Sequence, residues 1–239
     1  MSRLRSALLA ALACLIPAPA SATMVFSEIM YNPSSPEADW EWIELYNPLL
    51  ADHDLSGYVI DDINSLAHAA ANIASGVVPA GGSAILYNAD AITMGEFESA
   101  WGTGINLIPV TSWSAMGLNN TGDTIGLWSS FADYNGDHET HANVVEGVTY
   151  DDSGDWPADD GAASIYLTNL AGDVNNGSNW ALSVAGVSTP VGDAFQSSAT
   201  TSNTGGDVGS PVPEPSALAL LLTGPFGIAA LGRHRRTQS

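Results

Sequence analysis

A short segment near the middle of the chain has the residue types and spacing of a calcium-binding loop. Asp133, Asn135 and Asp137 follow the D-x-N-x-D pattern with which such loops begin, and Ca²⁺ prefers their oxygen ligands. The pattern then departs from an EF-hand, because His138 stands where the loop needs glycine and Val144 where it needs glutamate. The Asn-Gly dipeptide in this segment is also a favourable type I′ hairpin turn. The segment therefore has two interpretations, a metal loop and a hairpin.

Two acidic runs could hold the same ion. They are VTYDD at 148–152 and DWPADD at 155–160. Such runs are usually solvated loops, but oxygen ligands that lie close together also bind Ca²⁺. A calcium-dependent extracellular binding module is therefore the alternative to a purely structural function. Calcium is the one cofactor that the sequence suggests.

The histidines do not complete a catalytic or zinc motif. A zincin needs its second histidine four residues after the first, but His138 is followed by His141, and position 142 is alanine. No G-x-S-x-G nucleophile elbow occurs, and His53 and His68 have no evident nucleophile to serve. We therefore expect a protein that is not an enzyme, and an accessory role in hydrolysis ranks third.

Positive charge is confined to the two ends of the chain. All five Lys or Arg residues are arginines at positions 3, 5, 233, 235 and 236. Residues 23–210 contain none and carry 25 of the 26 acidic residues, only Glu214 lying outside, which gives this body a formal charge of −25. A polyanion without basic side chains cannot neutralise phosphates, so nucleic acid is excluded as a partner and anionic lipid headgroups are disfavoured. Its surface attracts water, cations and cationic partners.

The N-terminus predicts export. The first two arginines precede an apolar run over 7–16, which is too short to span a bilayer. Ala20 and Ala22 supply the small residues that signal peptidase accepts, so residues 1–22 are predicted to be a cleaved signal peptide. The alternative is a lipoprotein cut before Cys14, although Ala11 stands where such sites prefer a leucine-like residue. Removal of Cys14, the only cysteine, leaves a mature chain without a thiol or a disulfide.

The body has the sequence pattern of an all-β protein. Short runs rich in Val, Ile, Trp and Tyr alternate with clusters of Gly, Pro, Asn and Asp, which is typical of an antiparallel sandwich or barrel. In the run 41–47, alternation places Trp42 and Glu44 on one face and Ile43 on the other, as a half-buried strand requires. One helix is expected within 89–102. The seven predicted strands are 25–31, 41–47, 57–62, 83–88, 123–128, 143–150 and 163–168.

The order of these runs resembles a known family. The chain is similar to the lamin tail domain in its bacterial secreted form. The similarity lies in five segments in this order: SEIMYNP, DWEWIELYNP, DLSGYVIDD, GLNNTGDTIGLW and VVEGVTYDD. The resemblance implies an immunoglobulin-like antiparallel β-sandwich over residues 23–193, without catalytic machinery. Two segments are longer than the family pattern, 63–76 and 138–143. A function particular to this chain is expected there.

The C-terminal part predicts a sorting signal. Residues 194–211 are a linker rich in Ser, Thr and Gly. Residues 212–239 contain, in order, Pro213-Glu214-Pro215, an apolar segment at 217–231 and a basic tail at 233–236 with Arg233, Arg235 and Arg236. These three parts resemble the PEP-CTERM signal of exosortase substrates, with the apolar segment as a sorting helix.

The two terminal signals together imply a route to the cell surface. The basic tail would stay in the cytoplasm while the apolar segment associates transiently with the inner membrane. The resemblance implies that an exosortase then removes the tail, so signal peptidase and exosortase are the processing partners. A plain single-pass anchor is the alternative. We expect a structural or adhesive protein of the bacterial envelope or extracellular matrix, with components of that matrix as its partners.

Overall fold

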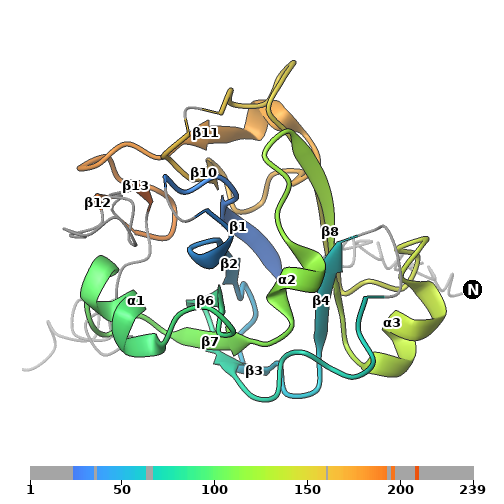
Figure 1. Ribbon diagram of the computed structural model, residues 1–239. Coiled ribbons are helices and arrows are strands. Elements are labelled where there is room, and N and C mark those ends of the chain that lie inside the picture. Colours follow the sequence, from blue (N-terminus) through green and yellow to red (C-terminus); the bar gives the residue numbers. More distant parts are fainter. Residues whose placement is uncertain are drawn as a thin grey trace, which may run out of the picture.

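The computed structural model describes residues 24–34, 37–62, 67–159 and 161–192, together with the backbone of 195–196 and 208–209 (Figure 1). The predicted signal peptide and sorting signal lie outside these residues, and so do the processing sites at Ala20, Ala22 and 213–215. Within the predicted linker, β12 (Phe195–Gln196) pairs with β13 (Val208–Gly209). Among the described residues, no helix has the length and apolar character needed to cross a membrane.

A six-stranded sheet forms the centre of the molecule. Its order is β11-β10-β1-β2-β6-β7, and all pairs are antiparallel except β6 with β7, which is parallel. The sequence predicted four of these strands and missed β7 and β11. The bounds are β1 Val25–Met30, β2 Trp42–Tyr46, β6 Ser83–Asn88, β7 Leu107–Val110, β10 Ile165–Leu167 and β11 Trp180–Leu182.

A second sheet packs against the first. It has three antiparallel strands in the order β4-β8-β9: β4 Val59–Asp62, β8 Gly122–Trp128 and β9 Glu146–Asp151. Ile60, Leu127 and Val148 from this sheet and Phe26 and Ile43 from the larger sheet belong to one buried core. A small ribbon joins β3 (His53–Asp54) to β5 (Val77–Val78). The fold is mostly β with antiparallel sheets, consistent with an immunoglobulin-like sandwich.

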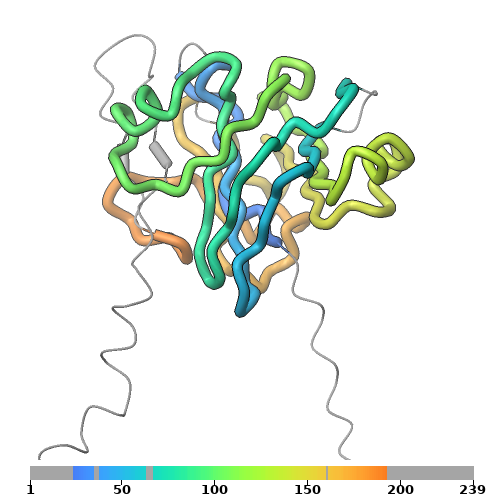
Figure 2. The backbone as a smooth tube through the Cα atoms, turned by 90° about the horizontal axis from the view of Figure 1, so that it is seen from below, coloured from blue at the N-terminus to red at the C-terminus, as the bar shows by residue number. Residues whose placement is uncertain are grey.

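Short helices lie on opposite sides of the sheets (Figures 1 and 2). The expected helix is α1 (Met94–Trp101), which begins at a capping box between Thr93 and Glu96. Its Phe97 and Trp101 pack on Trp42 and on Tyr87, on the face of the large sheet that points away from the core. The remaining helices are α2 (Trp113–Met116), α3 (Phe131–Asp137) and the single turns η1 (Glu37–Asp39) and η2 (Gly177–Asn179).

The outer face of the six-stranded sheet is covered at β2, which corrects the expectation that this strand is half-buried. Alternation in β2 is as predicted, because Ile43 faces the core between the sheets and Trp42 faces α1. The strand is not half-buried, however. Trp42 and Glu44 are as inaccessible as Ile43. Helix α1 covers Trp42, and Glu44 accepts hydrogen bonds from Ser27 and Ser83.

Asparagine side chains close two outer sheet edges. At β4, Asn72 accepts from the Ile60 N–H at 3.0 Å and donates to the Ile60 carbonyl at 2.8 Å. At β9, Asn175 accepts from the Thr149 N–H at 2.8 Å and donates to the Gly147 carbonyl at 3.4 Å. Open edges invite pairing with other chains, and proteins often guard them with lysine. This body has no lysine, and its amides satisfy the edge groups instead.

Candidate functional site

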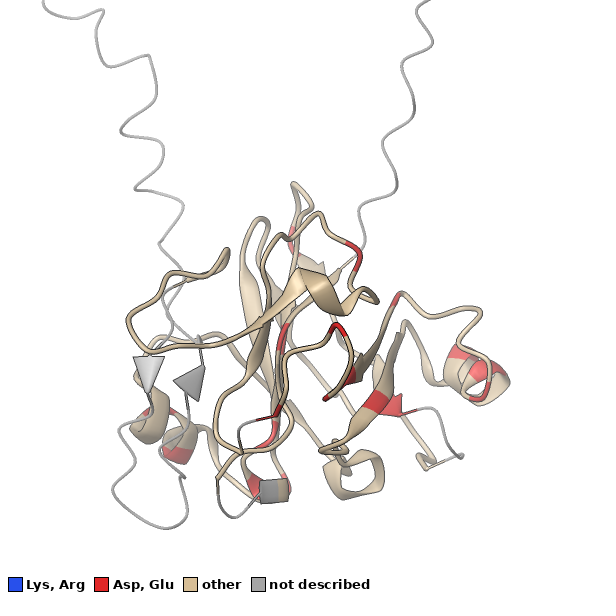
Figure 3. Ribbon diagram, turned by 90° about the horizontal axis from the view of Figure 1, so that it is seen from above, with Lys and Arg blue, Asp and Glu red and all other residues tan. Residues whose placement is uncertain are grey.

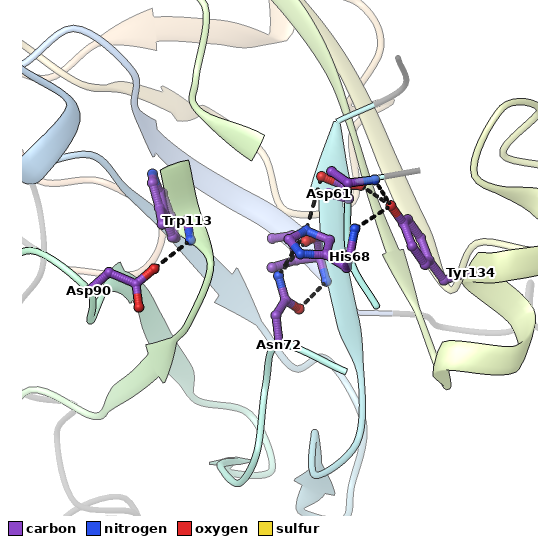
Figure 4. A network of polar contacts seen from close by, with 8 residues as sticks. Asp61, His68, Asn72, Asp90, Trp113 and Tyr134 are labelled. Atoms are coloured by element: carbon purple, nitrogen blue, oxygen red, sulfur yellow. Dashed lines mark hydrogen bonds and ion pairs between the residues drawn. The ribbon is translucent and has the colours of Figure 1, made fainter. Parts of the chain in front are cut away.

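The first of the two segments that exceed the family pattern meets β4 and α3 at one buried polar cluster (Figure 4). Asp61, at the end of β4, accepts a short hydrogen bond from the Tyr134 hydroxyl of α3. The Asp61 carboxylate also lies 3.1 Å from Nε2 of His68, which belongs to the first longer segment. Tyr134 in turn accepts from the Ala67 N–H at 3.0 Å. Asp61, His68, Asn72 and Tyr134 are all less than 5% exposed. We call these four residues the insertion clamp.

Local sequence explains why α3 forms beside the clamp. Ser130 caps the helix, and its hydroxyl accepts from the Asp133 N–H at 3.1 Å. Tyr134 then lies on the buried side, where its ring contacts Trp128 edge to face at 5.2 Å. The predicted hairpin turn at Asn135-Gly136 is therefore wrong. The serine cap and the buried tyrosine outweigh the turn preference of the Asn-Gly dipeptide.

The electrostatics of the clamp favour a static hydrogen-bonded unit. Burial and the adjacent Asp61 raise the pKa of Tyr134 to about 12, so its hydroxyl keeps its proton and donates. The second Asp61 oxygen receives no well-angled hydrogen bond, and its contact with His68 is an ion pair only when His68 is protonated. Asn72 lies 3.3 Å from the same His68 nitrogen and donates to Ile60.

An Asp–His pair beside a tyrosine resembles part of a catalytic site, but this geometry does not support catalysis. A general base must reach a proton on a substrate, and all four clamp side chains are closed off from solvent. The Tyr134 hydroxyl is engaged by Asp61, Ala67 and His68. The clamp therefore ties the 67–76 segment to α3 and to the edge of the second sheet.

The proposed calcium ligands do not converge. Asp133 and Asp137 lie four residues apart on α3, whereas Asn135 is rotated by about 200° and lies on the exposed side. Asp133 accepts from the hydroxyls of Ser129 and Ser130, both at 2.7 Å. The structure thus places the three candidates on one helix but does not bring them to a common point.

Asp137 has a different and well-defined role. Its buried carboxylate accepts from the Thr140 hydroxyl at 2.5 Å, the Ala142 and Asn143 N–H groups at 3.0 and 2.7 Å, and the Trp128 indole at 3.2 Å. Burial alone would raise the pKa of Asp137, but these four donors lower it to about 2. Asp137 therefore folds the second longer segment, 138–143, back onto the helix end.

The remaining candidates also make local contacts. His141 has a left-handed φ of 52°, its ring packs edge to face on Trp128 at 4.8 Å, and burial lowers its pKa. In the acidic runs, Asp151 accepts from the backbone and hydroxyl of Ser153, and Asp159 accepts from Asn32 at 2.5 Å. Across the described parts of the chain, no three His, Cys, Asp or Glu side chains are placed to hold a metal ion.

Three deeply buried glutamates were not predicted from the sequence. Glu28, Glu41 and Glu44 are each 1–2% exposed. Glu41 accepts from the Trp113 indole at 2.7 Å and from the Leu118 N–H at 3.1 Å, which ties α2 to the start of β2. A glutamate inside an apolar run is the signal that could have pointed to these buried acids. If both faces of such a strand are covered, its glutamates are buried as well.

Comparison with known families gives one match. The family model of the Lamin Tail Domain matches residues 17–169, well over half of the chain. Searches of curated proteins and of solved structures returned no significant match. The family match covers β1 through β10 and includes both longer segments.

Proposed function

Since the chain belongs to the lamin tail domain family, we propose that it is an exported, non-catalytic β-sandwich with a structural or adhesive role in the bacterial envelope or extracellular matrix. The observation that carries this proposal is the distribution of charge. Every Lys and Arg lies in a terminal segment, while residues 23–210 carry 25 acids. Figure 3 displays the acidic residues of the described body and no basic ones.

The buried polar groups support a role without catalysis. The insertion clamp, Asp137 and Glu41 each use their polar atoms to hold chain segments together. Catalytic groups need access to a substrate, and these groups have none. The acidic exterior would then hydrate the protein and attract cationic matrix components or bridging cations.

The terminal signals support delivery to the surface. A signal peptide over 1–22 would start export, and the segment from Pro213 to Arg236 would direct sorting by an exosortase. The mature protein would lack both charged ends.

Deletion of the gene tests the structural role. We expect weaker cohesion of the surface matrix and no loss of a hydrolytic activity. Complementation with the wild type should restore cohesion. The matched control is the full chain with R233Q, R235Q and R236Q. The cell should synthesise this variant but not sort it, so it should restore little cohesion. Unchanged cohesion after deletion would contradict the proposal.

A further inference from the structure

Two loops outside the insertion clamp meet at a partly exposed tryptophan. The loop after β9 carries Trp156, and the connection from β10 to β11 carries Gly177 and leads into Trp180. The rings of Trp156 and Trp180 lie 5.7 Å apart at an angle of 32°. Gly177 permits this arrangement, because a Cβ atom at that position would lie 2.6 Å from the Trp156 ring. We call Trp156, Gly177 and Trp180 the tryptophan platform.

The platform is held in place from behind. Trp180 is 5% exposed and donates its indole N–H to the Val174 carbonyl at 2.9 Å, which fixes its ring. Both tryptophans also pack against the core between the sheets. The backbone N–H of Trp156 donates to the Ser153 carbonyl at 3.2 Å, and the Ser153 N–H donates to Asp151 at 2.8 Å. A ligand would therefore meet side chains that need little further ordering.

Three polar groups beside the platform are available to a ligand. Within the part of the chain that the structure describes, no group accepts from the Trp156 indole N–H, which is not closed off from solvent. The exposed Asp155 precedes Trp156, and its carboxylate likewise has no donor among the described residues. The exposed Asn176 precedes Gly177 and uses its oxygen to accept from Ser178 at 3.2 and 2.8 Å. Its NH₂ group has no acceptor among the same residues.

An indole with such neighbours complements a sugar. One side of a pyranose ring is a set of C–H groups that can pack on an aromatic ring, and its rim carries hydroxyls that both donate and accept. Ligand sites commonly combine an apolar surface with a few polar groups that fix orientation. Charge narrows the class, because the formal charge of −25 on residues 23–210 repels acidic polymers. A neutral polysaccharide avoids this repulsion.

We propose that the tryptophan platform binds a neutral polysaccharide, with one pyranose ring packed on Trp156 and its hydroxyls bonded to Asp155 and Asn176. This rests on the matrix role proposed above and names the chemistry of one component that the body would hold. The acidic surface keeps the body hydrated, while the platform provides an attachment point that does not depend on charge.

Affinity electrophoresis of the full chain in gels that contain a polysaccharide tests the proposal. The neutral probes are hydroxyethyl cellulose, glucomannan and laminarin, and alginate is the acidic comparison. We expect at least one neutral probe to retard the wild type, and alginate not to. Trp156→Ala should weaken that binding at least about tenfold, as loss of an aromatic contact at the centre of a binding site does. Leu50→Ala is the matched control, because Leu50 is a fully exposed apolar side chain on another loop, and it should bind like the wild type.

A double variant keeps the proposal falsifiable if Trp156→Ala does not fold. Asn176→Asp retains the oxygen that accepts from Ser178 and replaces the NH₂ donor, while Asp155→Ala removes an exposed carboxylate. Combined, the two changes leave the net charge as it is. The double variant should melt like the wild type and bind the neutral probe several-fold more weakly.

Three results would overturn the proposal. They are a wild type that no neutral probe retards, a folded Trp156→Ala or double variant that binds like the wild type, and stronger retardation by alginate than by any neutral probe. Each would leave the matrix role standing, since the loss of cohesion on gene deletion tests that role separately.

Discussion

Asp137 at the end of α3 and the Glu28–Glu44 pair in the six-stranded sheet are buried acids in a body without Lys or Arg, yet their surroundings differ. Asp137 stands alone and accepts from four neutral donors, which lower its pKa to about 2. Glu44 and Glu28 accept from two serine hydroxyls each. The comparison indicates that this body holds its buried acids with hydrogen-bond donors from the backbone, from hydroxyls and from an indole, and that the number of donors on one carboxylate differs between the two regions.

The largest expected effect is at Asp137. Asp137→Ala leaves the Trp128 indole and the Ala142 and Asn143 N–H groups without their acceptor, and should lower the free energy of unfolding by about 2–4 kcal/mol. Urea denaturation at neutral pH measures it. Asp133→Ala, one turn earlier and exposed, is the control and should cost much less. Equal losses in the two variants would contradict the assigned role.

The carboxylate of Asp137 also gives the stability a pH dependence. Because the folded pKa of Asp137 is lowered, its stabilisation is present above the ordinary value of 3.8 and is lost as pH falls toward about 2. Asp137→Asn should therefore lose less stability than the wild type between about pH 4 and pH 2. Acid denaturation curves of the two proteins test this, and parallel curves would argue against it.

Tyr134→Phe should have an intermediate effect. It removes the donor to Asp61 and the acceptor for the Ala67 N–H, and should cost about 1–3 kcal/mol. The Ala67 amide should also exchange its hydrogen faster with solvent. Tyr46→Phe, a partly exposed position on β2, is the control. Unchanged exchange at Ala67 would contradict the insertion clamp.

The smallest effect is expected at the β9 edge. Asn175→Ala opens the Thr149 and Gly147 backbone groups to solvent and should cost about 0.5–1.5 kcal/mol. It should also increase association between chains, because an unpaired edge accepts a further strand. Light scattering during mild heating measures this. Asn135→Ala on the exposed side of α3 should not increase it.

Much of the fold could be predicted from the sequence, and the reasons are local. All seven predicted strands are present, because each has apolar alternation between turn residues. Gly57, directly before β4, takes a left-handed φ of 86° that favours glycine. The tryptophan side chains are buried, except that of Trp156, which is partly buried.

The missed features depend on contacts between distant segments. Alternation along β1 would place Phe26 and Glu28 on one face, but the bulge at Ser27 separates them. The clamp joins Asp61 to Tyr134 across 73 positions, and no local pattern encodes that contact. The parallel partner β7 follows α1 and lacks the alternation of a half-buried strand, since it is short and contains a proline.

We propose that the body reaches the surface without its two charged ends, and mass spectrometry of the native surface protein tests this most directly. We expect an N-terminus at Thr23 and no peptides from position 217 onward. Recovery of peptides containing Arg233 from most surface molecules would contradict processing at the C-terminus, and a start at Met1 would contradict export through a cleaved signal.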